Sequence, residues 1–422
     1  MNIYIETYGC SANQSDGEIM KGLLSRSFSI TENEKLANII ILNTCIVKGP
    51  TLKRMESRIK HFSRKRLIVS GCMPEVLSER IRKLAPKASM ISTHHVKQIV
   101  KVVKNIIEDK KVELIGKKKE VKLCMPKIPK NKIIGITQLS NGCLGNCAYC
   151  IVKNVKGNLF SYPQDKILKD IKQNLRAGCK EIWLTSQDNA AYGLDNGKNE
   201  LPILLKKILF LKNRFFIRLG MMNPSTLLPV VNEIIDCYKN KKMFKFLHLP
   251  VQSGSDKILK LMNRGYRVKD FIKIVEKFKR EIPDLTLSTD IIVGFPSESK
   301  EDFEKTLALV KKIKPDIINI SKYWPMPRTS ASEMKQLDEK EKKKRAFRLM
   351  KLHQKIALEK NEKLVGKRIR IFVDAKGFDD TWLARTMNYK VVVLKGKKLL
   401  GRVVDIEIRK VTSHYLMGVL LE

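Results

Sequence analysis

The chain has 422 residues, enough for two or three domains, and its hydrophobic content of 43% excludes a disordered protein. The net charge is +40, from 83 Lys and Arg against 43 Asp and Glu. It favours a polyanionic partner such as RNA or DNA, although solvated lysine faces would give the same count. The sequence has no signal peptide and no apolar run of membrane-spanning length, so we expect a cytoplasmic protein without a membrane partner. Nine cysteines then indicate metal or redox chemistry.

Residues 1–109 alternate strand and helix patterns, which predicts an open parallel α/β domain. Three short apolar runs are its predicted strands: Ile3–Thr7, Ile39–Asn43 and Leu67–Ser70. A cysteine follows each strand almost at once: Cys10, Cys45 and Cys72. Parallel strands end at the same edge of a sheet, so these thiols should converge. We interpret them as a three-cysteine iron–sulfur site; the alternative is three separately buried thiols.

Residues 110–132 are rich in lysine, which predicts a basic linker, and Cys124 within it stays unassigned. Strand and helix patterns resume over residues 133–325 and predict six β/α units in a partial barrel, with the active face at the carboxyl ends of the strands. The predicted strands are Ile133–Leu139, Glu181–Thr185, Phe215–Leu219, Phe246–Leu249, Thr286–Val293 and Ile317–Ser321. Cys179 and Cys237 fall in or beside helices, where packing thiols are expected.

The loop after the first barrel strand contains three closely spaced cysteines, Cys143, Cys147 and Cys150. Three thiolates can bind three irons of a 4Fe–4S cluster and leave the fourth iron open for catalysis. A zinc site would need a fourth ligand nearby, and no Cys or His follows within the next 25 residues. A disulfide would leave one thiol over and suits a secreted protein. The loop therefore predicts a catalytic iron–sulfur cluster.

Residues 326–365 predict a basic connector with an amphipathic helix that docks on the barrel and whose basic face is solvated. Residues 366–422 change to five short β-rich runs: Arg368–Val373, Trp382–Arg385, Lys390–Leu394, Gly401–Ile408 and Tyr415–Leu420. Five strands in so short a segment predict a small closed β-barrel of a kind often used on nucleic acids. Phe372 and Trp382 could stack bases there or belong to its core.

Several stretches together resemble the methylthiotransferase family of radical S-adenosylmethionine enzymes, and the resemblance covers essentially the whole chain. The cysteine loop, with Tyr149 before its last cysteine, resembles the cluster loop of these radical enzymes. Six further stretches resemble the archaeal and eukaryotic branch that acts on threonylcarbamoyladenosine in tRNA: residues 8–18, 42–48, 157–159, 181–188, 218–221 and 249–253. Ser297 departs from the family pattern, because a glycine is usual at that position.

The resemblance implies a mechanism. Cys143, Cys147 and Cys150 would hold a 4Fe–4S cluster that binds S-adenosylmethionine, and the first three cysteines would hold an auxiliary 4Fe–4S cluster that supplies sulfur. All six cysteines are thus the expected catalytic and metal-binding residues. A radical derived from S-adenosylmethionine would activate C2 of the adenine, and a second S-adenosylmethionine would supply the methyl group. The expected cofactor-binding residues are Tyr149, Ser186, Gln187, Arg218, Gln252 and Asp290.

The implied substrate is the anticodon loop of tRNA, where the modified base is single-stranded and can enter a cavity. The implied product is 2-methylthio-N6-threonylcarbamoyladenosine, and the C-terminal barrel would be a TRAM-like RNA-binding domain. An electron donor such as a ferredoxin or flavodoxin is a further expected partner, and a monomer is the default. Two alternatives keep the chemistry but act on isopentenyladenosine in tRNA or on a ribosomal protein aspartate. A third is a non-catalytic RNA-binding protein with structural metal.

Overall fold

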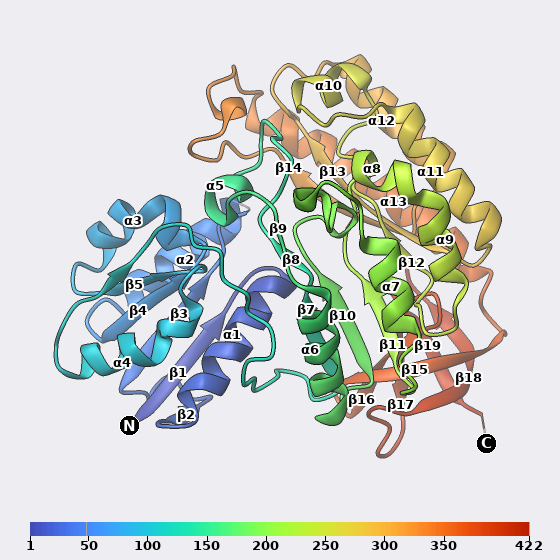
Figure 1. Ribbon diagram of the computed structural model, residues 1–422. Coiled ribbons are helices and arrows are strands. Elements are labelled where there is room, and N and C mark those ends of the chain that lie inside the picture. The colour runs from blue at the N-terminus through green and yellow to red at the C-terminus, as the bar shows by residue number, and fades with distance from the viewer. Residues whose placement is uncertain (48, 422) are drawn as a thin grey trace.

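The N-terminal part of the chain forms one parallel sheet (Figure 1). The structure is a computed structural model and describes residues 1–47 and 49–421. Six strands lie in the order β2-β1-β3-β4-β5-β6, with each neighbouring pair parallel. They are β1 Asn2–Thr7, β2 Ser29–Thr31, β3 Ile39–Thr44, β4 Arg66–Gly71, β5 Ser89–Ser92 and β6 Glu113–Leu114. The predicted open α/β domain is confirmed, with β3 and β4 buried at its centre.

Strands β2, β5 and β6 were not predicted, because they are only two to four residues long and show no clear apolar period. β6 also corrects the expectation of a plain linker over 110–132, since Glu113 and Leu114 pair with β5. Four helices cover the sheet: α1 Ser11–Leu24, α2 Gly49–His61, α3 Met73–Leu84 and α4 Ile99–Ile107. Helices α2 and α3 pack on one face, and α1 and α4 pack on the other.

The central part is a partial barrel of six parallel strands, in two sheets ordered β7-β10-β11 and β12-β13-β14. A bridge between Ile217 and Met243 links β11 to the segment before β12. The strands are β7 Ile134–Gln138, β10 Glu181–Thr185, β11 Phe216–Leu219, β12 Phe246–His248, β13 Thr286–Val293 and β14 Ile317–Lys322. Every predicted barrel strand is confirmed to within one residue at each end, because strands buried on both faces read as continuous apolar runs.

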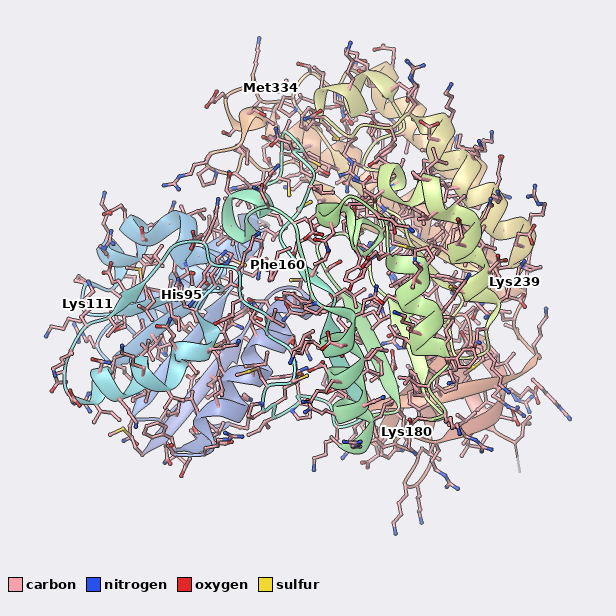
Figure 2. All side chains as sticks on the ribbon, in the orientation of Figure 1. His95, Lys111, Phe160, Lys180, Lys239 and Met334 are labelled. Atoms are coloured by element: carbon pink, nitrogen blue, oxygen red, sulfur yellow. The ribbon has the colours of Figure 1, made fainter. Side chains whose placement is uncertain are left out.

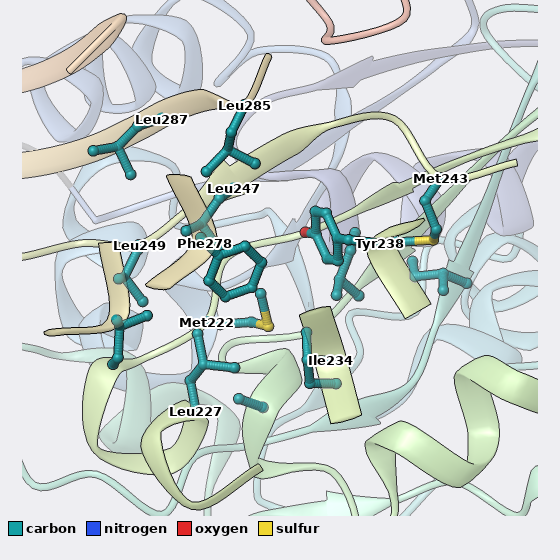
Figure 3. Packing of buried hydrophobic residues seen from close by; sticks show 14 of the residues in the cluster. Met222, Leu227, Ile234, Tyr238, Met243, Leu247, Leu249, Phe278, Leu285 and Leu287 are labelled. Carbon is teal, nitrogen blue, oxygen red and sulfur yellow. The ribbon is translucent and has the colours of Figure 1, made fainter. Parts of the chain in front are cut away.

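Helices surround the barrel strands: α6 Gln164–Arg176, α7 Leu201–Leu209, α9 Val231–Lys239, α11 Val268–Glu281 and α12 Lys300–Ile313. Figure 3 shows part of the core that they enclose, where the rings of Tyr238 and Phe278 meet edge to face with centroids 5.3 Å apart. Cys179 and Cys237 are buried in this core as packing thiols. No helix within residues 1–47 and 49–421 is both long and apolar enough to cross a membrane.

Helix α13, Glu339–Glu362, lies along β14 and α12 and confirms the predicted docking helix. Leu349 and Ile356 belong to the barrel core. The expectation of a solvated basic face is wrong in part, because Arg345 is buried and donates a hydrogen bond to Glu298 at 2.6 Å. A charged side chain tolerates burial when a counter-ion of this kind is in contact. This pair fastens α13 to the turn after β13.

That turn contains Ser297, which has φ +66° in the left-handed region. An L-residue pays about 1–2 kcal/mol for this conformation, whereas glycine adopts it freely. We expect Ser297→Gly to raise the free energy of unfolding by about 0.5 kcal/mol in urea titrations, since the relief of strain exceeds the added chain entropy. Ser297→Ala keeps the strain and is the control; an equal gain in that variant would contradict this explanation.

The C-terminal part is a closed five-stranded barrel, as predicted, in the order β15-β16-β17-β19-β18. Its strands are β15 Arg368–Lys376, β16 Thr381–Thr386, β17 Val391–Lys395, β18 Val403–Val411 and β19 Leu416–Leu420. It packs against the central barrel through aromatic rings, with Phe372 and Tyr389 in one cluster with Phe244 and Phe246. Phe372 is only 1% exposed, so its core interpretation is correct and it cannot stack on bases.

Basic side chains project from every part of the molecule. Figure 2 shows Lys111 on the N-terminal domain, Lys180 near the C-terminal barrel, and Lys239 at the end of α9. Lys180 also donates a hydrogen bond to the carbonyl of Gly401 at 2.9 Å, which ties the two barrels together. The positive charge is therefore distributed over all three parts rather than confined to the C-terminal barrel.

Candidate active site

Three cysteines meet at the carboxyl edge of the N-terminal sheet. Cys10 immediately precedes α1, Cys45 follows β3, and Cys72 lies between β4 and α3. The pKa of Cys72 is raised to about 12, mainly by burial; Lys156 opposes this, and the thiols of Cys45 and Cys10 add to it. Thr44 pairs with Gly71, and the backbone N–H of Cys72 donates to the carbonyl of Thr44 at 3.0 Å, so the turns that carry Cys45 and Cys72 are neighbours. The structure therefore brings the three predicted residues together, and we call them the N-terminal triad.

Two glycines permit this close approach. Gly9 has φ +100°, and a Cβ there would lie 2.8 Å from Sγ of Cys45. Gly71 has φ +91°, and a Cβ there would lie 2.5 Å from the carbonyl oxygen of Thr44. Any side chain at either position would push the cysteine-bearing turns apart, so both glycines are part of the site.

The second cysteine set, which we call the loop triad, lies between β8 (Ser140–Asn141) and α5 (Val152–Lys156). The backbone N–H of Cys150 donates to the carbonyl of Cys147 at 3.0 Å, and that of Gly145 donates to Sγ of Cys143 at 3.3 Å. Burial, followed by the Cys147 thiol, raises the pKa of Cys150 to about 12. The loop thus folds back on itself and gathers its three sulfurs on one side.

Arg264 is a site residue that sequence reasoning missed. It is 6% exposed, and its guanidinium donates to Sγ of Cys147 at 3.1 Å and to Oδ1 of Asn223 at 3.2 Å. The same group lies 3.4 Å from the hydroxyl of Tyr149. These contacts place a buried guanidinium directly against a sulfur of the loop triad. Arg264 follows α10 (Asp256–Leu261) in a turn with no motif, so no sequence signal marked it.

A cavity of about 580 Å³ opens beside the loop triad. Tyr149 and Cys150 form one wall, and Gln252 and Asp290 at the barrel strands form another, so these three predicted cofactor residues face the same space. The N-terminal domain contributes Gly49 to a third wall. A Cβ on Gly49 would lie 2.2 Å from the ring of Trp324, which shows how closely the domain and the barrel rim meet.

The polar residues of this cavity are held in a defined geometry. Gln252 has φ +69°, and its backbone N–H donates to the carbonyl of Asp290 at 2.8 Å. Strained backbone at a residue other than glycine concentrates at functional sites. Asn319 donates to Oδ1 of Asp290 at 2.7 Å, and Nε2 of His248 lies 3.1 Å from the same oxygen. His248 and Asn319 were not predicted, because only the barrel geometry brings them beside Asp290.

Ser186 and Gln187 follow β10 on the same face of the barrel. Oγ of Ser186 and Oε1 of Gln187 are buried and have no hydrogen-bond partner among the described residues. Buried polar atoms in native proteins are nearly always paired, so unpaired ones at strand ends fit a site that takes a polar ligand. This supports their predicted place in a cofactor pocket.

Arg218 has different surroundings from the other predicted cofactor residues. Its guanidinium lies over the rings of Trp183, Phe246 and Tyr389, with distances to their centroids of 4.9, 5.4 and 5.6 Å. Tyr389 belongs to the C-terminal barrel, so these contacts connect Arg218 to the interface between the two barrels. The assignment of Arg218 to the cofactor pocket stays a prediction.

Both triads fit an iron–sulfur cluster better than a single metal ion. Within the described part of the chain, no three His, Cys, Asp or Glu side chains are arranged to hold one ion. A 4Fe–4S cluster takes each thiolate on a different iron, so its ligands are spread more widely. All nine cysteines are free, which removes the disulfide alternative. Each triad offers three thiols, which is the number of protein ligands that a 4Fe–4S cluster with one open iron would take.

Three family profiles match the chain. An uncharacterised protein family, UPF0004, matches residues 2–93, the radical SAM superfamily matches residues 137–310, and the TRAM domain matches residues 362–421. These regions contain the N-terminal triad, the loop triad and the C-terminal barrel in turn.

Curated relatives match almost the whole chain. Proteins of Methanothermobacter thermautotrophicus and Pyrococcus horikoshii, each named probable threonylcarbamoyladenosine tRNA methylthiotransferase, are 37% and 38% identical over 422 and 429 residues, covering 99% of both chains in each case. The human threonylcarbamoyladenosine tRNA methylthiotransferase is 35% identical over 428 residues, which is 99% of this chain and 73% of the human one.

Two solved structures have a similar fold. The radical S-adenosylmethionine methyltransferase TsrM from Kitasatospora setae has a TM-score of 0.57 at 12% identity, covering 78% of this chain and 74% of its own. The cobalamin-dependent radical enzyme OxsB has a TM-score of 0.53 at 12% identity, covering 84% of this chain and 56% of its own. Both support the α/β barrel architecture.

Proposed function

This chain belongs to the threonylcarbamoyladenosine tRNA methylthiotransferases of the radical SAM superfamily, and from this premise we propose that it adds a methylthio group to C2 of N6-threonylcarbamoyladenosine just 3′ of the anticodon. The cofactors are S-adenosylmethionine and two 4Fe–4S clusters, one on each triad. The enzyme acts on tRNA in the cytoplasm as a monomer, and a ferredoxin or flavodoxin supplies electrons.

One observation carries this proposal: the cavity beside the loop triad is bounded by elements that belong to both triads. Cys150 lines it directly. Gly49, which lines it from the other side, begins the helix that follows Cys45. A base held in this cavity would lie against Cys150 of the loop triad, with the segment that follows Cys45 as part of the opposite wall. A structural metal protein has no need of such an arrangement.

The protein's own groups have distinct tasks at the carboxyl ends of the barrel strands. Arg264 holds the sulfur of Cys147 and the hydroxyl of Tyr149 in position. The unpaired atoms of Ser186 and Gln187 are available to the polar groups of S-adenosylmethionine. The loop-triad cluster, when bound, supplies the electron that cleaves S-adenosylmethionine. The close contact of Gly49 with Trp324 brings the N-terminal domain against the barrel at the wall of the cavity.

Mass spectrometry of tRNA nucleosides tests this proposal. A host that lacks its own enzyme of this kind expresses either the intact chain or its Cys143→Ala variant. We expect 2-methylthio-N6-threonylcarbamoyladenosine only with the intact chain. Cys237→Ala, which changes a core thiol in the same barrel, is the matched control and should retain the product.

The other outcomes are equally informative. If methylthio-isopentenyladenosine accumulates instead, the chemistry stands and the substrate is wrong. If neither nucleoside forms while the purified protein contains iron, the tRNA substrate is refuted, and ribosomal proteins are the next substrate class to examine. Colourless protein that contains zinc would refute the enzyme itself.

A further inference from the structure

A buried charge cluster joins the N-terminal domain to the barrel next to the N-terminal triad. Asp16 of α1 accepts hydrogen bonds from Lys122 through both carboxylate oxygens, each at 2.7 Å, and from Gln138 of β7 at 3.0 Å. Lys156, the last residue of α5, lies 3.8 Å from Asp16 and donates to the hydroxyl of Thr93 at 2.6 Å. Four separate segments of the chain therefore meet around a single carboxylate.

The charges in this cluster do not balance. The side chains of Asp16, Lys122 and Lys156 are 1%, 2% and 4% exposed, so two ammonium groups share one carboxylate out of contact with water. Lys122 takes both oxygens of Asp16 at 2.7 Å, whereas Lys156 forms only a longer ion pair with the same carboxylate at 3.8 Å and, among the described residues, no other ion pair is recorded for it. Burying a net positive charge is costly unless an anion lies nearby.

The N-terminal triad is the source of negative charge that lies next to Lys156. Burial lowers the pKa of Lys156, but Asp16 and then Cys72, Cys10 and Cys45 raise it, and the net shift is upward. The packing agrees with this: helix α5 contacts α3, and Val155, the neighbour of Lys156, lies in the same hydrophobic cluster as Cys72. A 4Fe–4S core bound by three thiolates has a net negative charge and would compensate the unbalanced lysine.

We propose that Lys156 is the fixed counter-ion of the auxiliary cluster on Cys10, Cys45 and Cys72. The inference rests on the proposed second cluster and adds a residue that positions and tunes it. Lys156 is carried by the helix that directly follows Cys150. The counter-ion of one cluster is therefore delivered by the loop that ligates the other, so the auxiliary site is complete only when the N-terminal domain is docked on the barrel.

The test uses the full chain in which Cys143, Cys147 and Cys150 are replaced by alanine, so that only the auxiliary cluster remains. Iron and sulfide content and the reduction potential are measured in this background with and without Lys156→Met. Adding an electron makes the cluster more negative, and loss of a nearby cation disfavours that state. We expect a more negative potential and lower iron occupancy. An unchanged potential at full occupancy would overturn the proposal.

Lys127→Met is the matched control. Lys127 is 10% exposed and pairs at 3.0 Å with Asp170, a carboxylate of the barrel helix α6 and not of the N-terminal domain. Its removal should leave the potential and the iron content of the background unchanged. An equal shift in this variant would mean that general loosening, not a specific charge, is responsible.

Asp16→Asn should shift the reduction potential in the opposite direction to Lys156→Met. It leaves both ammonium groups in place and removes the carboxylate, so we expect a more positive potential. If both variants shift the potential in the same direction, the counter-ion role is refuted. If circular dichroism shows that Lys156→Met is unfolded, the direction of the potential shift in Asp16→Asn alone tests the proposal: a positive shift supports it, and a negative or absent shift refutes it. A background protein that binds no iron would refute the second cluster itself, and this inference with it.

Discussion

Replacing Cys10, Cys45 and Cys72 together by alanine is expected to stop methylthio transfer while cleavage of S-adenosylmethionine continues. The reason is structural: the loop triad, Arg264 and most of the cavity wall belong to the barrel and do not depend on the N-terminal thiols. Iron should fall by about four atoms per chain, the content of one 4Fe–4S cluster. Product nucleosides, 5′-deoxyadenosine and iron are measured on the same anaerobic preparation.

Replacing the loop triad instead should abolish both reactions and remove a similar amount of iron. Cys179→Ala is a suitable control, because this thiol is buried among apolar side chains of the barrel core and should not affect iron binding. Loss of S-adenosylmethionine cleavage in the N-terminal variant would contradict independent roles for the two sites. Full iron content in either triad variant would contradict the ligand assignment.

The main features of this site could be predicted because they are local in sequence. Each barrel strand is a short apolar run, and the loop triad lies within a single eight-residue segment, 143–150. The N-terminal triad is spread over the domain, but it follows from one general rule, that parallel strands end at the same edge of a sheet. Periodicity and spacing are therefore sufficient to predict the two places where the six cysteines gather.

The residues that support the site could not be predicted in this way. Arg264 and Lys156 are ordinary basic residues in a chain with 83 of them, and only the fold shows that both are buried beside cysteines. His248 and Asn319 contact Asp290 from the two neighbouring strands, and the sequence alone does not show which residues of neighbouring strands lie side by side. Phe372 reads equally well as a base-stacking or a core residue until the interface between the barrels is known.

The interface between the two barrels contains a carboxyl group that we expect to make its stability depend on pH. Glu181 lies at the start of β10, fully buried, where its Oε1 accepts hydrogen bonds from the Tyr389 hydroxyl at 2.7 Å and from the Trp183 indole at 2.6 Å. Burial, followed by the negative charge of Asp374, raises the pKa of Glu181 from 4.5 to about 7. The folded protein therefore holds this proton more tightly than the unfolded chain.

The direction of the effect follows from this difference in proton binding. Stability contributed by protonated Glu181 is present below about pH 4.5 and is lost as the pH rises through 7. Since one pKa unit corresponds to about 1.4 kcal/mol, ionisation should cost about 3 kcal/mol by pH 8. Glu181→Gln has no carboxyl group to ionise. Its free energy of unfolding should therefore increase relative to that of the intact chain as the pH rises through that window. Urea unfolding at pH 5 and pH 8 measures this, and taking the difference between the two proteins cancels other titrating groups.

Tyr389→Phe separates the carboxyl group from the packing of its ring. The variant keeps the aromatic contacts with Phe244 and Phe246 but removes the hydroxyl that holds the pKa of Glu181 down. The loss of stability should then occur at a higher pH than in the intact chain, whereas a change in packing alone would shift stability equally at every pH. A pH-independent difference between Glu181→Gln and the intact chain would show that Glu181 is ionised in the folded protein throughout. The Tyr389 and Trp183 hydrogen bonds would then hold a charged carboxylate at the base of the barrel.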